Sequence, residues 1–173
     1  MAISLYDISV ASYLQTLGAV AGFLEKGKSY CNEKGIDLSE VVETRLYSDM
    51  LPFRFQVISV VHHSLGAIKG IQAGLFSPPA GYGEPDYDGL QTLVASAKQE
   101  LEALDRAAVN SFEGKEVAFA LGDRRMPFVA EDFVMSFSLP NFHFHAATAY
   151  DILRIEGVPI GKRDYMGALR MKR

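Results

Sequence analysis

Four long stretches of the chain place apolar residues three and four positions apart, which is the spacing of one face of an α-helix. They cover residues 3–32, 48–73, 88–109 and 131–156. In each stretch the apolar residues share one face and the polar residues share the other. Because each helix must bury its apolar face against another element, the pattern predicts an all-α fold, a four-helix bundle.

Residues that start and stop helices stand at the ends of these stretches. Glycines follow three of them, at Gly35, Gly74 and Gly157. Ser48 or Asp49 can cap the second stretch, and Asp86 or Asp88 can cap the third, because their side-chain oxygens accept from unpaired N–H groups. Pro140 lacks a backbone N–H and predicts a kink in the fourth helix.

The connections differ in kind. Residues 40–46, after a cap at Asp37 or Ser39, predict a short connecting helix. Residues 117–129 alternate in hydrophobicity around Gly122 and Asp123, which predicts a β-hairpin inserted before the last helix. Residues 75–89 carry many prolines and glycines and predict a loop. Two of its residues, Tyr82 and Tyr87, are candidates for a lid over a pocket or for anchors of the loop to the body.

Composition and charge narrow the class of protein. The 173 residues are 49% hydrophobic and 22% charged, as expected of one globular domain covering residues 1–173. A net charge of −4 gives no electrostatic reason to bind nucleic acid or an anionic membrane surface. No apolar run approaches the ~20 residues of a membrane-spanning helix, and the N-terminus lacks the basic start of an export signal. The single cysteine, Cys31, cannot form an intrachain disulfide, so we expect a cytoplasmic protein.

Two polar stripes border the predicted core and supply the candidate pocket residues. On the second helix the stripe repeats every seven positions, and it consists of Asp49, Gln56 and His63. On the fourth helix it follows i, i+4 and i+7 spacing, and it consists of Asn141, His145 and Thr148. If the stripes face each other, they form a polar seam that can hold a small ligand or an ion.

Helix geometry limits which of these residues can act together. Asp49 and His63 are 14 positions apart, about 21 Å along a helix, and cannot share one ion. His63 with His145, or Asp49 and Gln56 with His145, can converge. A purely structural interpretation competes with this: Asp49 as a helix cap, Gln56 as an amide bonded to backbone, and His145 as a satisfied core histidine. The neighbours His62 and His63 point about 100° apart on a helix, which predicts that one of them faces solvent.

Several longer motifs add a resemblance to a known family. They are residues 45–53, 56–57, 139–145, 148–154 and 157–167. With these motifs the chain resembles an uncharacterised bacterial family of unknown function that is placed with the DinB/YfiT-like four-helix bundles. The resemblance implies that fold. It also implies a relation to a superfamily described as metalloenzymes, including thiol-dependent transferases, many of which bind a divalent metal through three histidines.

The histidine spacing departs from the superfamily pattern. Its members carry one metal-binding histidine on the second helix and two on the fourth, four positions apart. Here His143 and His145 are two apart, which turns them roughly 200° from each other on a helix. Of these two histidines, only His145 matches a metal-binding position of the superfamily. His63 is its candidate partner for a divalent metal. The three-histidine site is therefore incomplete in this sequence.

These observations lead to two hypotheses about function. The first is a homodimeric bundle that binds a small molecule or a partner between helices two and four. The alternative is a metal-dependent enzyme, a hydrolase or a thiol-dependent transferase. The two hypotheses differ in whether the purified protein contains a bound metal.

Overall fold

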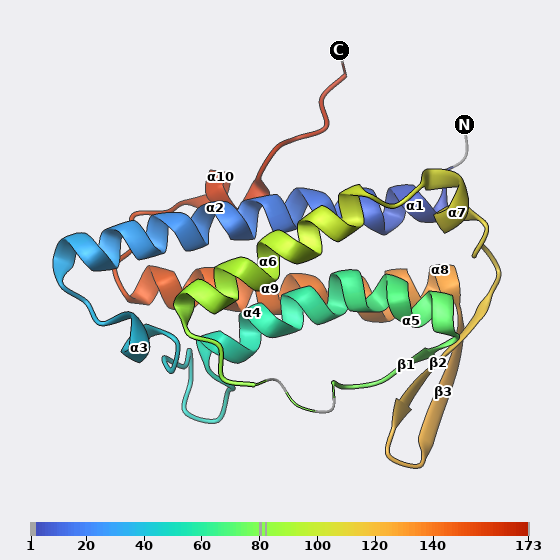
Figure 1. Cartoon of the computed structure of the whole chain (residues 1–173), viewed down its shortest axis with the longest axis horizontal. Helices are drawn as coiled ribbons and strands as arrows, with labels where there is room; N and C mark the ends of the chain where they lie inside the picture. Colours follow the sequence, from blue (N-terminus) through green and yellow to red (C-terminus); the bar gives the residue numbers. More distant parts are fainter. Residues whose placement is uncertain (1–2, 80, 82, 173) are drawn as a thin grey trace.

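The computed structural model describes residues 3–79, 81 and 83–172 of the chain. It is mostly helical, with a small three-stranded sheet at one end of the long helices (Figure 1). The elements, with η for a π-helix, are α1 (Leu5–Ile8), α2 (Val10–Lys34), α3 (Leu38–Val41), α4 (Phe53–Val61), η1 (His62–Gly66), α5 (Ala67–Ala73), β1 (Leu75–Phe76), α6 (Tyr87–Glu102), α7 (Arg106–Asn110), β2 (Glu116–Leu121), β3 (Arg124–Val129), α8 (Ala130–Asp132), η2 (Phe133–Ser138), α9 (Leu139–Ile155) and α10 (Lys162–Met166).

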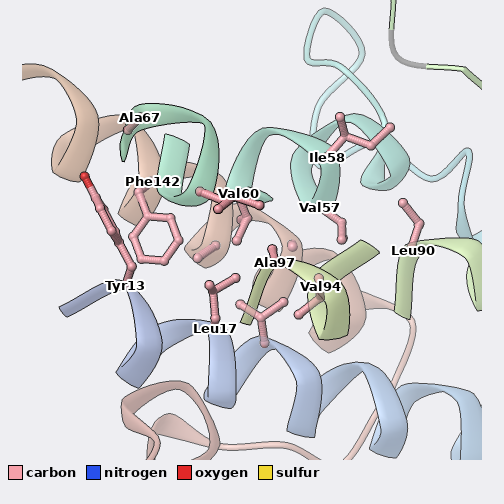
Figure 2. Close-up of a cluster of buried hydrophobic side chains, with 14 of the residues drawn as sticks. Tyr13, Leu17, Val57, Ile58, Val60, Ala67, Leu90, Val94, Ala97 and Phe142 are labelled. Carbon is pink, nitrogen blue, oxygen red and sulfur yellow. The ribbon is translucent and has the colours of Figure 1, made fainter. Parts of the chain in front are cut away.

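The long helices bury their apolar faces against one another. Helix α2 packs on α6 and α9, and α4 packs on α9 and α6. Figure 2 shows side chains from all four of these helices meeting in the core. Among them, Leu17 of α2, Val57 of α4, Val94 of α6 and Phe142 of α9 are each 0% exposed. One continuous apolar core therefore fixes how these helices face each other.

The first predicted helix is interrupted close to its start. Ser9 leaves helical geometry (φ −103°, ψ −87°) and separates α1 from α2. Its buried hydroxyl donates to the Leu5 carbonyl at 2.5 Å, so this polar group is paired at the break. The predicted end is confirmed: Gly35 adopts a left-handed conformation (φ 69°) directly after Lys34.

The start predicted for the second helix is wrong. Helix α4 begins at Phe53, with Pro52 as its cap residue, and Asp49 lies exposed in the preceding turn. The backbone N–H of Phe53 donates to the Thr44 carbonyl at 2.8 Å, so the connector backbone takes the place of a capping side chain. The end is confirmed by Gly74, which is left-handed at φ 76°.

Aspartate side chains start three other helices. Asp37 accepts from Ser39 and begins α3, which ends at Val41, earlier than the connecting helix predicted over residues 40–46. Asp86 accepts from the Gly89 N–H at 2.8 Å and begins α6. The predicted continuation to residue 109 is wrong, because Asp105 accepts from the Ala108 N–H and starts a separate helix, α7.

The second and fourth helical stretches each contain a π-helical turn. In the second, η1 lies between α4 and α5, and in the fourth, η2 lies between α8 and α9. Pro140 sits in the first turn of α9, directly after η2. A proline inside a helix leaves a carbonyl four residues earlier without its donor, and a widened turn is one way to accommodate this.

The sheet joins two parts of the chain that are far apart in sequence. Strands β2 and β3 are antiparallel, with the left-handed Gly122 (φ 57°) in the turn between them. Strand β1 pairs in parallel with β2, with Phe76 opposite Phe119. The loop predicted over residues 75–89 therefore begins as a strand. Its pairing places Phe76 over the second helical stretch.

The end of the chain returns along α2. Gly157, confirmed as the residue that ends α9, is left-handed at φ 88°. A short helix, α10, follows it and packs on α2, with an ion pair between Lys26 and Asp164 at 2.5 Å. Within the described part of the chain, every helix is too short or too polar to cross a lipid bilayer.

Candidate functional site

A pocket of about 250 Å³ lies between the second helical stretch and α9, and residues of β1 and β2 border it. We call it the histidine pocket. Its lining residues are Phe55, Ser59, His62, His63, Phe76, Pro78, Phe119, Phe137, Asn141 and His145. A larger groove of about 840 Å³ lies elsewhere, and two of its three charged lining residues, Asp7 and Arg106, already pair with each other at 2.8 Å. The smaller pocket is lined by three histidines, His62, His63 and His145.

A chain of two hydrogen bonds fixes the protonation of His145. The Gln56 side-chain Nε2 donates to the Leu51 carbonyl at 2.7 Å. A carbonyl can only accept, so the other amide atom, Oε1, faces His145, whose Nδ1 lies 2.8 Å away. Nδ1 must therefore carry the proton and donate it to Gln56. In the neutral ring, Nε2 is then left with a free lone pair.

Burial keeps this ring neutral. Desolvation lowers the pKa of His145 from its ordinary 6.5 to about 4, because the charged form would lose its hydration. At neutral pH the His145 side chain is therefore a hydrogen-bond acceptor or a metal ligand through Nε2, and it is not a cation.

His63 stands beside His145 and is even more deeply buried. The two rings are nearly parallel (16°), with centroids 5.7 Å apart. Burial, together with the neighbouring His62 and His145, lowers the pKa of His63 to about 3. Its Nδ1 is buried and finds no hydrogen-bond partner among the described residues. An unpaired buried polar atom costs on the order of 1–3 kcal/mol, so this position is one that a structural role alone does not explain.

The backbone of His63 is held by a buried relay from the other side of the core. The Ser138 hydroxyl donates to the His63 carbonyl at 2.6 Å, and the Tyr13 hydroxyl donates to Ser138 at 2.7 Å. Tyr13 and Ser138 are both fully buried. His63 is the second residue of η1, and Ser138 is the last residue of η2. The relay therefore links the two π-turns and sets where the His63 ring enters the pocket.

Aromatic rings form most of the remaining wall. The His62 ring stacks on Phe76 with centroids 4.4 Å apart, and Phe76 meets Phe137 edge to face at 6.1 Å. Phe119 of β2 lies 4.7 Å from Phe137. Burial lowers the pKa of His62 too, and a hydrogen bond with the Ser77 backbone partly opposes this. The prediction that one of the two histidines faces solvent holds only in part: His63 is buried and His62 is half-buried, because Phe76 of β1 packs against both rings.

Comparison with known proteins adds family membership to this geometry. A family model described as a domain of unknown function (DUF1993) matches residues 5–166. The chain belongs to the DUF1993 family. The crystal structure of a DinB family member protein from Shewanella denitrificans resembles this DUF1993 chain with a TM-score of 0.80. Sequence identity is 24%, over 98% of this chain and 95% of that one. At that identity the likeness shows the fold alone. None of the curated proteins compared with the chain matches it.

The predicted resemblance is thus confirmed in two respects: the chain belongs to a family of unknown function, and its fold resembles that of a DinB family member. Of the six residues predicted for the pocket, the structure places His63, Asn141 and His145 in its lining. Gln56 lies behind the wall as the partner of His145. The Asn141 side chain donates to the Phe137 carbonyl at 2.7 Å.

The other two predicted residues lie outside the pocket. Asp49 is in the exposed turn before α4, because the helix starts four residues later than the seven-residue repeat required. Thr148 is buried, and its hydroxyl donates to the Phe144 carbonyl at 2.8 Å, one turn back on α9. Thr148 is therefore a satisfied core residue of this DUF1993 protein.

The three-histidine metal site that the resemblance implied does not fit these residues. His63 and His145 converge, but His143 lies exposed on another face of α9, with its ring near the Tyr165 hydroxyl. Among the described residues, no group of three or more His, Cys, Asp or Glu side chains is arranged to hold a metal ion. Two imidazoles alone make a weak site for a divalent metal.

Sequence reasoning missed the residues that reach the pocket from outside the two stripes. Phe76 and Phe119 arrive through the pairing of β1 with β2, which has no local sequence signal. Tyr87 is not a lid: it is 2% exposed and its hydroxyl donates to the Leu24 carbonyl at 2.9 Å, so it anchors the start of α6. Tyr82, the other candidate lid residue, lies outside the described residues.

Proposed function

We propose that this DUF1993 protein is a four-helix bundle whose function is to bind a small molecule in the histidine pocket, between the second helical stretch and α9. The observation that carries the proposal is the buried, unpaired Nδ1 of His63 beside a neutral His145. Native proteins rarely leave such an atom without a partner unless the site has a use for it.

The way the protein supports His145 adds to the proposal. Gln56 is 2% exposed. Its amide nitrogen bonds to the backbone and its amide oxygen bonds to His145, so both atoms help to orient this one ring. Holding a defined tautomer with a free Nε2 is what a binding site for a hydrogen-bonding ligand requires. A histidine with a purely structural role would have both nitrogens bonded.

Binding can be tested by NMR with a collection of small neutral, acidic and basic compounds added to the labelled protein. We expect some compounds to shift pocket resonances, and their affinity to fall about tenfold or more in His145→Ala, since that variant removes both a hydrogen bond and packing area. The matched control is His143→Ala, which removes an exposed histidine two residues away on the same helix. The proposal fails if no compound binds, or if both variants bind like the wild type.

The alternative is a metal-dependent hydrolase or thiol-dependent transferase. It rests on the same two converging imidazoles, His63 and His145, and needs further ligands that the described residues do not place beside them. Elemental analysis of untagged protein distinguishes the two functions. We expect less than about a tenth of an equivalent of any divalent metal, since two-ligand sites are weak. A full equivalent, lost in His145→Ala and kept in His143→Ala, would favour the enzyme.

A further inference from the structure

The histidine pocket offers no ionised partner to a ligand. None of the described residues in its lining is a lysine, arginine, aspartate or glutamate. Burial also keeps its imidazoles uncharged at neutral pH, since the pKa of His63 falls to about 3 and that of His145 to about 4. A charged ligand would lose its hydration here and gain no countercharge. The pocket therefore selects neutral molecules.

The shape and surface of the pocket favour a flat ring. Phe76, Phe119 and Phe137 line it together with the nearly parallel rings of His63 and His145. Aromatic rings in such surroundings gain from edge-to-face and offset stacking beyond their burial. A volume of about 250 Å³ admits one or two fused rings.

Two polar atoms of the wall, one on His145 and one on Asn141, remain as hydrogen-bond acceptors. The neutral His145 ring donates its one N–H, on Nδ1, to Gln56, so the lone pair on Nε2 is free to accept. The Asn141 amide uses its nitrogen to donate to the Phe137 carbonyl, which leaves its oxygen as the second acceptor. A ligand that fits these atoms must supply an N–H or O–H group.

From charge, shape and acceptors together we infer that the pocket takes a neutral aromatic molecule of one or two rings carrying an N–H or O–H donor, of the indole or phenol type, with His145 Nε2 as the atom that receives the donor. The inference rests on the proposed function and names its ligand class.

Two isomers test the donor without changing size. 3-Methylindole keeps its ring N–H, and 1-methylindole has a methyl group in that place. We expect 3-methylindole to bind wild-type protein about threefold to tenfold more tightly, which is the contribution of one neutral hydrogen bond. Its binding should also move the ¹⁵N resonance of His145 Nε2, and 1-methylindole should not. Indole-3-carboxylate, which keeps the N–H but adds a charge, should bind about tenfold or more weakly than 3-methylindole.

Variants locate the acceptor. His145→Phe keeps a flat ring but has no lone pair, so it should bind the two isomers equally, while His143→Ala should keep the wild-type preference. If His145→Phe does not fold, the isomer comparison in wild-type protein still decides. Equal affinities in wild type, or tight binding of the carboxylate, would overturn the ligand class and leave pocket binding intact. If no aromatic or aliphatic compound perturbs the pocket, the proposed function itself fails.

Discussion

At the scale of single residues, the pocket depends on histidines that are neutral in the folded protein. In the unfolded chain these side chains take up a proton near their ordinary pKa of 6.5, but burial lowers the pKa of His63 to about 3 and that of His145 to about 4 in the folded protein. A group with a lowered pKa of this kind stabilises the fold when it is neutral. Its contribution is complete above pH 6.5 and falls as the pH falls toward the folded-state value.

We therefore expect the free energy of unfolding to decrease between pH 6.5 and 4, by about 1.4 kcal/mol per pH unit for each of the two histidines. Urea unfolding at about pH 7.5, 6 and 5 measures this. His63→Phe should give a shallower dependence. Aspartates with lowered pKa, such as Asp7 and Asp164, lose their contribution only around and below their ordinary value of 3.8, so they add little in this range. Stability that is constant or rises toward pH 5 would contradict the burial of neutral imidazoles.

At the scale of elements, the two π-turns are joined by the relay from Tyr13 through Ser138 to the His63 carbonyl. Figure 2 shows Tyr13 packed beside Phe142, and their rings meet edge to face at 5.1 Å. Ser138 is the centre of the relay, because it accepts from one partner and donates to the other. Removing it takes a hydrogen-bond partner from two buried groups, whereas removing the Tyr13 hydroxyl leaves the serine bonded to His63.

We expect Ser138→Ala to lower the free energy of unfolding by about 2–4 kcal/mol and Tyr13→Phe by about 1 kcal/mol. The double variant should cost less than the two single changes together, since both act on one relay. Urea unfolding of the three variants checks the order. A larger loss in Tyr13→Phe than in Ser138→Ala would mean that the relay does not hold the π-turns.

Helix α2 offers a second test at this scale, with an internal control. A Cβ atom added at Gly27 would lie 2.5 Å from the Tyr87 hydroxyl oxygen and 3.2 Å from Leu153, whereas one added at Gly22 meets nothing within 4 Å. We expect Gly27→Ala to destabilise the protein by about 1–3 kcal/mol through overpacking. Gly22→Ala should stabilise it by about 0.5–1 kcal/mol, because alanine is the better helix former. Thermal unfolding of both variants decides; equal effects would contradict close packing of α6 on α2.

At the scale of the whole molecule, exposed apolar side chains on α9 favour association of two copies. Phe144 is 55% exposed and Ile155 is 60% exposed on this helix. We expect a homodimer with twice the 19.0 kDa mass of one chain, measured by size-exclusion chromatography with light scattering. Ile155→Glu should shift it toward the monomer, since a buried charge opposes the contact. A wild-type monomer at micromolar concentration would rule the dimer out.

The sequence by itself determined the features that depend on neighbours along the chain. Helical periodicity located the long helices, and Gly35, Gly74 and Gly157 marked their ends because a left-handed residue is needed there and glycine adopts it without strain. Motifs spread along the chain indicated the family. The spacing of Asn141 and His145 also placed both on one face of α9, where they line the pocket.

Only the tertiary structure decided what depends on residues distant in sequence. Helix α4 starts at Phe53, where its first N–H bonds to the connector backbone, and the relay from Tyr13 holds the His63 backbone across the core. The seven-residue repeat therefore could not show that Asp49 lies before the helix while His63 enters the pocket. Phe76 covers the histidines because β1 pairs with a strand more than forty positions later. Burial itself, which makes His63 and His145 neutral, is the sum of packing by several helices and the sheet. Local pattern fixes each helix, but the chemistry of the pocket is set by the environment that only the folded chain creates.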